Sequence, residues 1–302
     1  MGVNLTAPVV ASPRPGWASA WIGRLAVATL VTNIAIVVTG GVVRLTGSGL
    51  GCPTWPRCTD ESFVPHGALG IHGAIEFGNR MVTFLLAAVA IATFVAAWRL
   101  GRPPILRLAF LLGLGVPAQA VVGGITVLTD LNPWIVAFHL LVSLAMIGLS
   151  VVLLRRLREG DGPALLTVPA ASAWLVRVTF VVGWVVLYVG TVVTGSGPHA
   201  GDVKAPRNGL DPESLSQLHT DVVFLLVGLT IGSLFALRSA GAPARAVRAA
   251  STLLAIELAQ GTVGFVQYFT DLPVVLVGLH LLGAALVSAA LAWLLVGIRD
   301  RA

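Results

Sequence analysis

The feature that most constrains this chain is a series of long apolar runs. The hydrocarbon core of a bilayer is roughly 30 Å thick, and a helix needs about 20 mostly apolar residues to cross it. Eight runs of the 302-residue sequence meet this requirement: about 24–44, 70–98, 105–128, 134–154, 174–194, 215–237, 249–269 and 274–297. The pattern predicts an all-α integral membrane protein with eight transmembrane helices in the lipid bilayer. The first run is too long for the core of a signal peptide and is expected to remain as the first helix.

The positions of the basic residues predict how the helices cross the membrane. Eight crossings leave both termini on one side, which holds Arg14, Arg24, Arg99, Arg102, Arg107, Arg155, Arg156, Arg158, Arg177, Arg238, Arg245, Arg248, Arg299 and Arg301. The other side and its helix ends hold Arg44, Arg57, Arg80, Lys204 and Arg207. Because arginine and lysine are enriched in cytoplasmic segments, both termini are predicted to be cytoplasmic. Short basic clusters between apolar runs do not form a basic stripe, so no nucleic-acid partner is predicted despite a pI of about 10.6.

An internal repeat divides the chain into two halves. A shift of 141 residues aligns residues 118–141 with 259–282 without a gap, and 11 of the 24 positions are identical. The identities include three polar pairs: Gln119 with Gln260, Asp130 with Asp271, and His139 with His280. Polar residues are costly in a membrane, so similar composition does not explain these matches. A four-helix repeat keeps its orientation, which predicts two four-helix bundles, 1–160 and 161–302, related by a pseudo-two-fold axis along the membrane normal.

Four histidines fall at similar depths in the even-numbered runs. They are His72, His139, His219 and His280, each within a few turns of the predicted external end. Two imidazoles from neighbouring helices can serve as the axial ligands of a haem iron in the core of a bundle. Hydrogen bonds between helices, or a proton or transport pathway, are the alternatives.

The segment HGAIEFGNR, residues 72–80, makes the two halves unequal. An offset of 140 places Asn79 opposite His219, so the first half has an amide where the second half has a histidine. At 100° per residue, His72, Glu76 and Asn79 share one helix face, which is predicted to point inward. Glu76 precedes Arg80 by four residues, the favourable order for an ion pair. Glu76 is therefore either the partner of Arg80 or an acid–base group beside a redox site.

Both cysteines of the chain lie in the first predicted external loop. Cys52 and Cys58 occur in GSGLGCPTWPRCTD, on the oxidising side of the membrane where a disulfide persists. Their spacing permits a small ring, which would be a structural staple or a redox-active pair.

Several of these motifs together resemble the haem A synthase family. The resemblance rests on VVTGGVVRLTGSGLGCPTWPRC, IEFGNR, VTGSGPHAGD, QLHTD and the paired TDL…HLL segments, and it covers nearly all of the chain. It implies a bacterial multi-pass cell-membrane enzyme that oxidises a porphyrin methyl group of haem O to a formyl group, which gives haem A for cytochrome oxidase assembly.

The resemblance also implies roles for individual residues. His219 and His280 would hold a permanent haem b in the second half, and His139 would ligate the substrate haem O in the first half. Glu76 and Arg80 match the glutamate and arginine of the family's Glu-x-x-His-Arg motif, whereas Asn79 stands at its histidine. Either His72 replaces that ligand, or His139 is the single protein ligand and the other face of the iron is open.

The remaining expectations concern partners and rival functions. An electron donor, a haem O synthase and a second copy of the chain are the candidate partners. Arg44, Arg80 or Lys204 would neutralise the haem propionates, while His66 and His199 are expected to be solvated or to stabilise loops. The alternative functions are a two-haem electron carrier that oxidises quinol, which two equivalent histidine pairs would favour, and a transporter.

Overall fold

A computed structural model describes residues 17–301, and these residues are almost entirely helical. The eight long helices are α1 (Trp17–Leu45), α2 (Gly70–Leu100), α3 (Pro103–Leu128), α4 (Pro133–Arg156), α5 (Ala170–Ser196), α6 (Pro212–Ser239), α7 (Ala244–Phe269) and α8 (Val274–Gly297). Each is long and apolar enough to cross a membrane, which confirms the predicted all-α class and number of helices. Residues 1–16 and residue 302 lie outside the described part of the chain, and with them Arg14 and both chain ends.

Local sequence signals set the helix boundaries. Proline occupies the first turn of α3, α4 and α6, where its missing N–H needs no partner. The side chain of Asn132 accepts a hydrogen bond from the Trp134 N–H at the start of α4, and Asp211 accepts one from Ser214 at the start of α6. Gly101 ends α2 with a φ of 71°, a left-handed conformation that favours glycine. These caps extend several helices a few residues beyond the predicted apolar runs.

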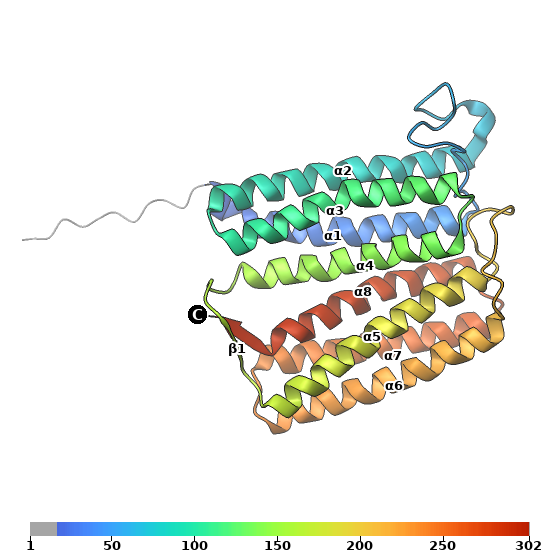
Figure 1. Ribbon diagram of the computed structural model, residues 1–302. Coiled ribbons are helices and arrows are strands. Elements are labelled where there is room, and N and C mark those ends of the chain that lie inside the picture. The colour runs from blue at the N-terminus through green and yellow to red at the C-terminus, as the bar shows by residue number, and fades with distance from the viewer. Residues whose placement is uncertain (1–16, 302) are drawn as a thin grey trace, which may run out of the picture.

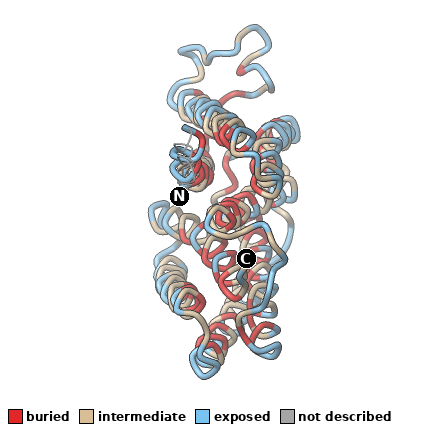
Figure 2. Tube along the Cα trace, turned by 90° about the vertical axis from the view of Figure 1, so that its left-hand side faces the viewer, coloured by how far each residue is buried: buried red, intermediate tan, exposed pale blue. Residues whose placement is uncertain are grey.

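The eight helices pack side by side (Figure 1). Consecutive helices contact one another, and the two halves of the chain join where α4 and α8 meet. The Ser288 hydroxyl of α8 donates a 2.7 Å hydrogen bond to the Leu144 carbonyl of α4 across this junction. Figure 2 shows the buried residues on the inward faces of the helices and the exposed residues around the outside. An exposed apolar perimeter is the expected surface of a chain solvated by lipid.

The two ends of the helices differ in chemistry. One end, called here the disulfide end, carries the loops 46–69, 129–132, 197–211 and 270–273. The opposite, arginine-rich end holds a two-stranded antiparallel sheet of β1 (Ala164–Leu166) and β2 (Arg299–Arg301), which joins the α4–α5 link to the last described residues. Three ion pairs connect the segments at this end: Arg155 with Glu159, Arg102 with Asp161, and Arg245 with Asp300.

The sequence repeat recurs in the hydrogen bonds between helices. The hydroxyls of Thr29 and Thr93 lie 2.9 Å apart between α1 and α2, as those of Thr179 and Ser233 do between α5 and α6. The turn between α3 and α4 contains an Asp-Leu pair with positive φ, Asp130–Leu131, and the turn between α7 and α8 contains another, Asp271–Leu272. A non-glycine residue with positive φ is uncommon, so two such pairs at matching positions indicate that both halves use the same turn conformation.

Candidate functional site

All eight helices and the loops of the disulfide end line one cavity of about 2080 Å³. Sites for one drug-sized ligand rarely exceed about 1,000 Å³. The cavity therefore has room for more than one large ligand. His139, His219 and His280 all line it, together with Glu76, Asn79 and Arg80.

The second half brings two histidine rings close together in an edge-on arrangement. His219 lies on α6 and His280 on α8, and the centroids of their rings are 6.5 Å apart at an interplanar angle of 75°. Two imidazoles on opposite sides of one metal, each with a metal–nitrogen bond of about 2 Å, would have centroids about 6 Å apart. The separation therefore fits two axial ligands of a single haem iron.

Each of the three helical histidines is backed by a glycine of the preceding odd-numbered helix. A methyl group added at the glycine would lie 3.3 Å from Cε1 of His139 at Gly123, 3.0 Å from that of His219 at Gly190, and 3.5 Å from that of His280 at Gly264. The buried Nδ1 atoms of the three rings have no hydrogen-bond partner in the described chain. Three orphaned, glycine-backed rings facing one cavity form a donor set suited to haem iron.

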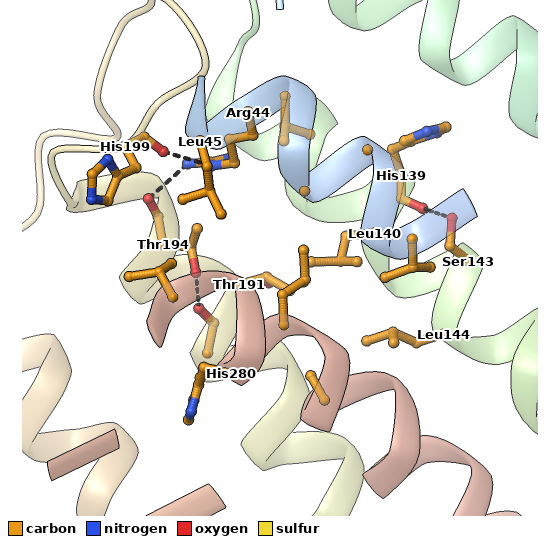
Figure 3. A pocket seen from close by; sticks show the side chains of 18 of the residues that line it. Arg44, Leu45, His139, Leu140, Ser143, Leu144, Thr191, Thr194, His199 and His280 are labelled. Carbon is orange, nitrogen blue, oxygen red and sulfur yellow. Dashed lines mark hydrogen bonds between the residues drawn. The ribbon is translucent and has the colours of Figure 1, made fainter. Parts of the chain in front are cut away.

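A matching hydrogen bond fixes the backbone at two of these histidines. The Gln119 amide of α3 donates to the His139 carbonyl at 2.9 Å, and the Gln260 amide of α7 donates to the His280 carbonyl at 3.1 Å. The glutamine pair of the sequence repeat thus has a structural role. Figure 3 shows the rings of His139 and His280 pointing away from each other, with Leu140 between them. The two histidines consequently serve different regions of the cavity.

Asn79 of α2 lines the first-half region of the cavity that also contains His139. Its carbonyl oxygen accepts a 2.7 Å hydrogen bond from the Thr39 hydroxyl of α1. An amide held in this way is a poor ligand for iron. The described first half therefore presents one histidine to the cavity, whereas the second half presents His219 and His280 from its helices and His199 from a loop.

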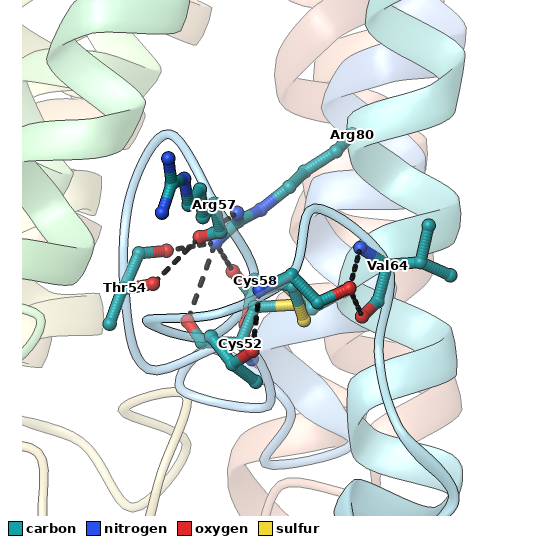
Figure 4. The surroundings of a disulfide bond; sticks show 9 residues. Cys52, Thr54, Arg57, Cys58, Val64 and Arg80 are labelled. Atoms are coloured by element: carbon teal, nitrogen blue, oxygen red, sulfur yellow. Dashed lines mark hydrogen bonds and ion pairs between the residues drawn. A yellow bond between two sulfur atoms is a disulfide. The ribbon is translucent and has the colours of Figure 1, made fainter.

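Glu76 and Arg80 attach α2 to the disulfide loop, and Figure 4 shows Arg80 reaching into this loop. The buried Glu76 carboxylate accepts a 2.6 Å hydrogen bond from the Cys52 N–H at one oxygen and pairs with Arg80 at 2.5 Å at the other. The Arg80 guanidinium also donates to the carbonyls of Thr54 and Arg57. The predicted ion pair is present, and it holds a loop as well as neutralising charge.

The disulfide loop closes the first-half region from the disulfide end. Cys52 and Cys58 form the predicted disulfide. Trp55, between them in sequence, lines the cavity and lies against Gly124 of α3 so closely that a Cβ there would overlap the indole ring. Sequence reasoning did not identify Trp55 or Gly124. The available signal was the glycine pair 123–124, which lies in the same repeated segment, 118–141, as His139.

His72 does not join the other site residues. It is exposed in the first turn of α2, is not among the cavity-lining residues, and its Nδ1 lies 2.9 Å from the Ser48 hydroxyl. The inward face predicted for His72, Glu76 and Asn79 thus extends to Glu76 and Asn79 only. The reason is that α2 begins at Gly70, so His72 lies at the level of the loops.

Three arginines reach the cavity near the disulfide end: Arg44, Arg80 and Arg207. Arg44 donates to the carbonyls of His199 at 2.6 Å and Thr194 at 2.8 Å, and it has no carboxylate partner in the described chain. The predicted alternative Lys204 is exposed and does not line the cavity. His199 links loops through a 2.9 Å contact of its Nε2 with the Leu272 carbonyl, whereas His66 is exposed. Arg80 is paired with Glu76, whereas Arg44 and Arg207 have no carboxylate partner among the described residues and suit an anionic substituent of a ligand.

The sequence of the chain was compared with those of known protein families. The sequence profile of the COX15-CtaA family, described as cytochrome oxidase assembly protein, matches residues 23–72 and 70–204. The chain belongs to this family. The matched residues contain Glu76, Asn79, Arg80 and His139.

Curated relatives agree with the family profile. A protein from Geobacillus thermodenitrificans named heme A synthase is 31% identical over 138 residues, which cover 45% of this chain and 43% of the relative. A Lysinibacillus sphaericus protein of the same name is 30% identical over 56% of each chain, and one from Rhizorhabdus wittichii is 26% identical over 96% of each. The aligned region thus spans less than half of the Geobacillus relative.

One further polar residue of this family member was not identified from its sequence. Glu257 of α7 lines the second-half region of the cavity, with 4% of the residue exposed. One carboxyl oxygen accepts a 2.8 Å hydrogen bond from the Thr230 hydroxyl of α6, and the other is buried without a partner in the described chain. A lone acid within an apolar run was the available signal.

Proposed function

We propose that this chain is a haem A synthase that oxidises a methyl group of haem O to a formyl group. The observation that carries the proposal is one cavity shared by two unequal sites, a facing histidine pair in one half and a single histidine beside a polar cluster in the other. The heme A synthase relatives support the same assignment. The alternative, a two-haem electron carrier, is less well supported because the two sites are not equivalent.

His219 and His280 would hold the resident haem b of the second half. This haem would supply one-electron redox chemistry when bound, and the protein would supply ligation and an apolar surrounding. A Cβ at Gly190 would crowd the His219 ring, whereas one at Gly264 would lie at ordinary contact distance from the His280 ring. Gln260 fixes the backbone that presents His280.

His139 would bind the substrate haem O in the first half as its single protein ligand. Asn79, held by Thr39, would not ligate the iron, so a small molecule would have access to it beside Asn79. We do not propose His72 as a second ligand because it lies outside the cavity. Arg44 and Arg80 would pair with the propionates at the disulfide end.

Glu76 would act at the open face in two ways. Its pairing with Arg80 and Cys52 positions the disulfide loop and Trp55 over the substrate, which excludes water from the first-half site. As the cavity-lining carboxyl beside Asn79, it would also exchange the protons that methyl oxidation releases. Cys52 and Cys58 serve as a staple of this lid in the proposal.

The proposed topology follows the charges. Helices α1–α4 and α5–α8 form two pseudo-two-fold-related units, 1–160 and 161–302, in a bacterial cell membrane, with both termini cytoplasmic and the disulfide end external. Haem O would enter laterally from the bilayer, supplied by a haem O synthase, and a membrane electron donor would supply electrons. A homo-oligomer is compatible with this arrangement.

The test is to express the chain in membranes that contain haem O, purify it, and identify the extracted haems by chromatography and mass. Wild type should hold haem b together with haem A or its alcohol precursor. Glu76→Ala should hold haem b and unreacted haem O, and His72→Ala should match the wild type. Haem b alone in wild type, at two sites and with no haem O product, would establish the electron carrier instead.

A further inference from the structure

The Thr230–Glu257 pair is a polar site that the proposed haem ligation does not use. Glu257 lies seven residues before Gly264, which backs His280, and seven residues return to nearly the same face of a helix. At 1.5 Å per residue this is about 10 Å along the axis toward the arginine-rich end. The carboxyl therefore lines the cavity about two turns from the level of the His280 ring.

The fold does not require a polar pair at this position. An offset of 141 places Val116 at the position of Glu257, and an offset of 140 places Ala90 at the position of Thr230. Both first-half residues are buried and apolar. The first half thus packs the same helices without an acid, so the acid serves something specific to the second half.

No opposite charge accounts for the buried carboxyl. The titratable groups of the two helices packed against α7 are Glu213, His219, Asp221 and Arg238 on α6 and His280 on α8, and α7 itself adds Arg245, Arg248 and Tyr268. None of them pairs with Glu257 in the described chain. From Thr230, His219 is about 16 Å and Arg238 about 12 Å along α6. Because no opposite charge lies beside this carboxyl, its negative charge can be neutralised only by uptake of a proton.

We propose that Glu257 is a proton-binding site coupled to the redox state of the haem b held by His219 and His280. The carboxylate takes up one proton from cavity water as the iron accepts one electron from a reduced quinone, and it releases the proton when the electron leaves. The added negative charge near the iron is thereby neutralised. This inference rests on the proposed haem b site.

The experiment is an optical redox titration of the purified, haem b-containing protein at a series of pH values, with dithionite, ferricyanide and mediators. In wild type, the midpoint potential should fall with rising pH by up to about 59 mV per pH unit, the value for one proton per electron. Glu257→Gln should lose most of this slope. The exposed acid Glu61 supplies the matched control, because Glu61→Gln should keep the wild-type slope.

A second variant separates titration from packing. Thr230→Val removes the hydroxyl but keeps the carboxyl, so the slope should persist. Redox-difference infrared spectra should also show a carboxyl band in wild type that shifts in Thr230→Val. This measurement tests proton uptake by Glu257 even where Glu257→Gln does not fold.

Equal slopes in wild type and Glu257→Gln, or a wild-type potential independent of pH, would overturn the inference and leave haem binding intact. Absence of a bis-histidine haem spectrum in wild type would instead overturn the proposed haem b site.

Discussion

Glu76 of α2 accepts a 2.6 Å hydrogen bond from the backbone N–H of Cys52, so a membrane helix and the disulfide loop share one buried carboxylate. The other oxygen of this carboxylate pairs with Arg80, which in turn binds loop carbonyls. The conformation of the loop over the first-half site is therefore tied to the charge of Glu76.

Glu76→Gln should weaken this attachment. A glutamine keeps one acceptor oxygen but loses the charge that pairs with Arg80, and hydrogen bonds to charged groups contribute about 1.5–3 kcal/mol each. We expect a loss of that order in the free energy of unfolding, measured in detergent. Glu61→Gln, a change in an exposed residue of the same loop, should have no comparable effect; equal stabilities of the two variants would contradict the attachment.

Replacement of both cysteines by serine tests the loop as a lid. Closing a ring with a sequence separation of 6 stabilises the folded chain by about 2 kcal/mol in the chain-entropy description. The double variant should be less stable by about this amount and should retain less haem O while its haem b content stays unchanged. A parallel loss of both haems would show instead that the loop supports the whole fold.

Asn79→His should convert the first-half site into a two-histidine site. Position 79 aligns with His219 in the repeat and faces the same cavity as His139. The bound haem O should change to a low-spin, bis-histidine absorption and electron paramagnetic resonance spectrum. Asn79→Leu is the control that removes the amide without adding a ligand and should leave the spectrum unchanged.

Gly124→Ala should displace Trp55 from α3. A Cβ at position 124 would overlap the indole, and such overpacking typically costs about 1–3 kcal/mol. Gly113→Ala is the matched control in the same helix, because a Cβ there meets no atom within 4 Å. The control should be neutral or more stable by up to about 1 kcal/mol. Thermal unfolding and protease sensitivity of the loop would measure the difference.

The interaction of Asp161 with Arg102 should make the stability of the protein depend on pH in the acid range. The hydrogen bond from Arg102 holds the pKa of the Asp161 carboxyl below its ordinary 3.8. A depressed folded-state pKa contributes stability above the unfolded value, and this contribution is lost as the pH falls below about 3.8 toward the folded-state value. The melting temperature of Asp161→Asn should therefore be lower than that of wild type at neutral pH and approach it in acid. A difference independent of pH would contradict this origin.

Sequence alone determined the elements whose physics is local or compositional. Helix number and approximate bounds follow from apolar length, because a membrane span needs a fixed number of apolar residues. The disulfide follows from there being two cysteines in one loop, and the correspondence of Gln119 with Gln260 follows from an ungapped repeat of costly polar residues.

Tertiary structure alone decided which side chains reach the cavity. Helical periodicity correctly grouped Glu76 with Asn79, but the same face carried His72 one turn further, where the surroundings are Ser48 and a loop. Trp55 meets Gly124 only because the loop folds back over α3, and Glu257 matters because the cavity extends to its level. A sequence period fixes the angle of a residue around its helix, whereas what lies opposite that angle depends on how the other helices and loops pack.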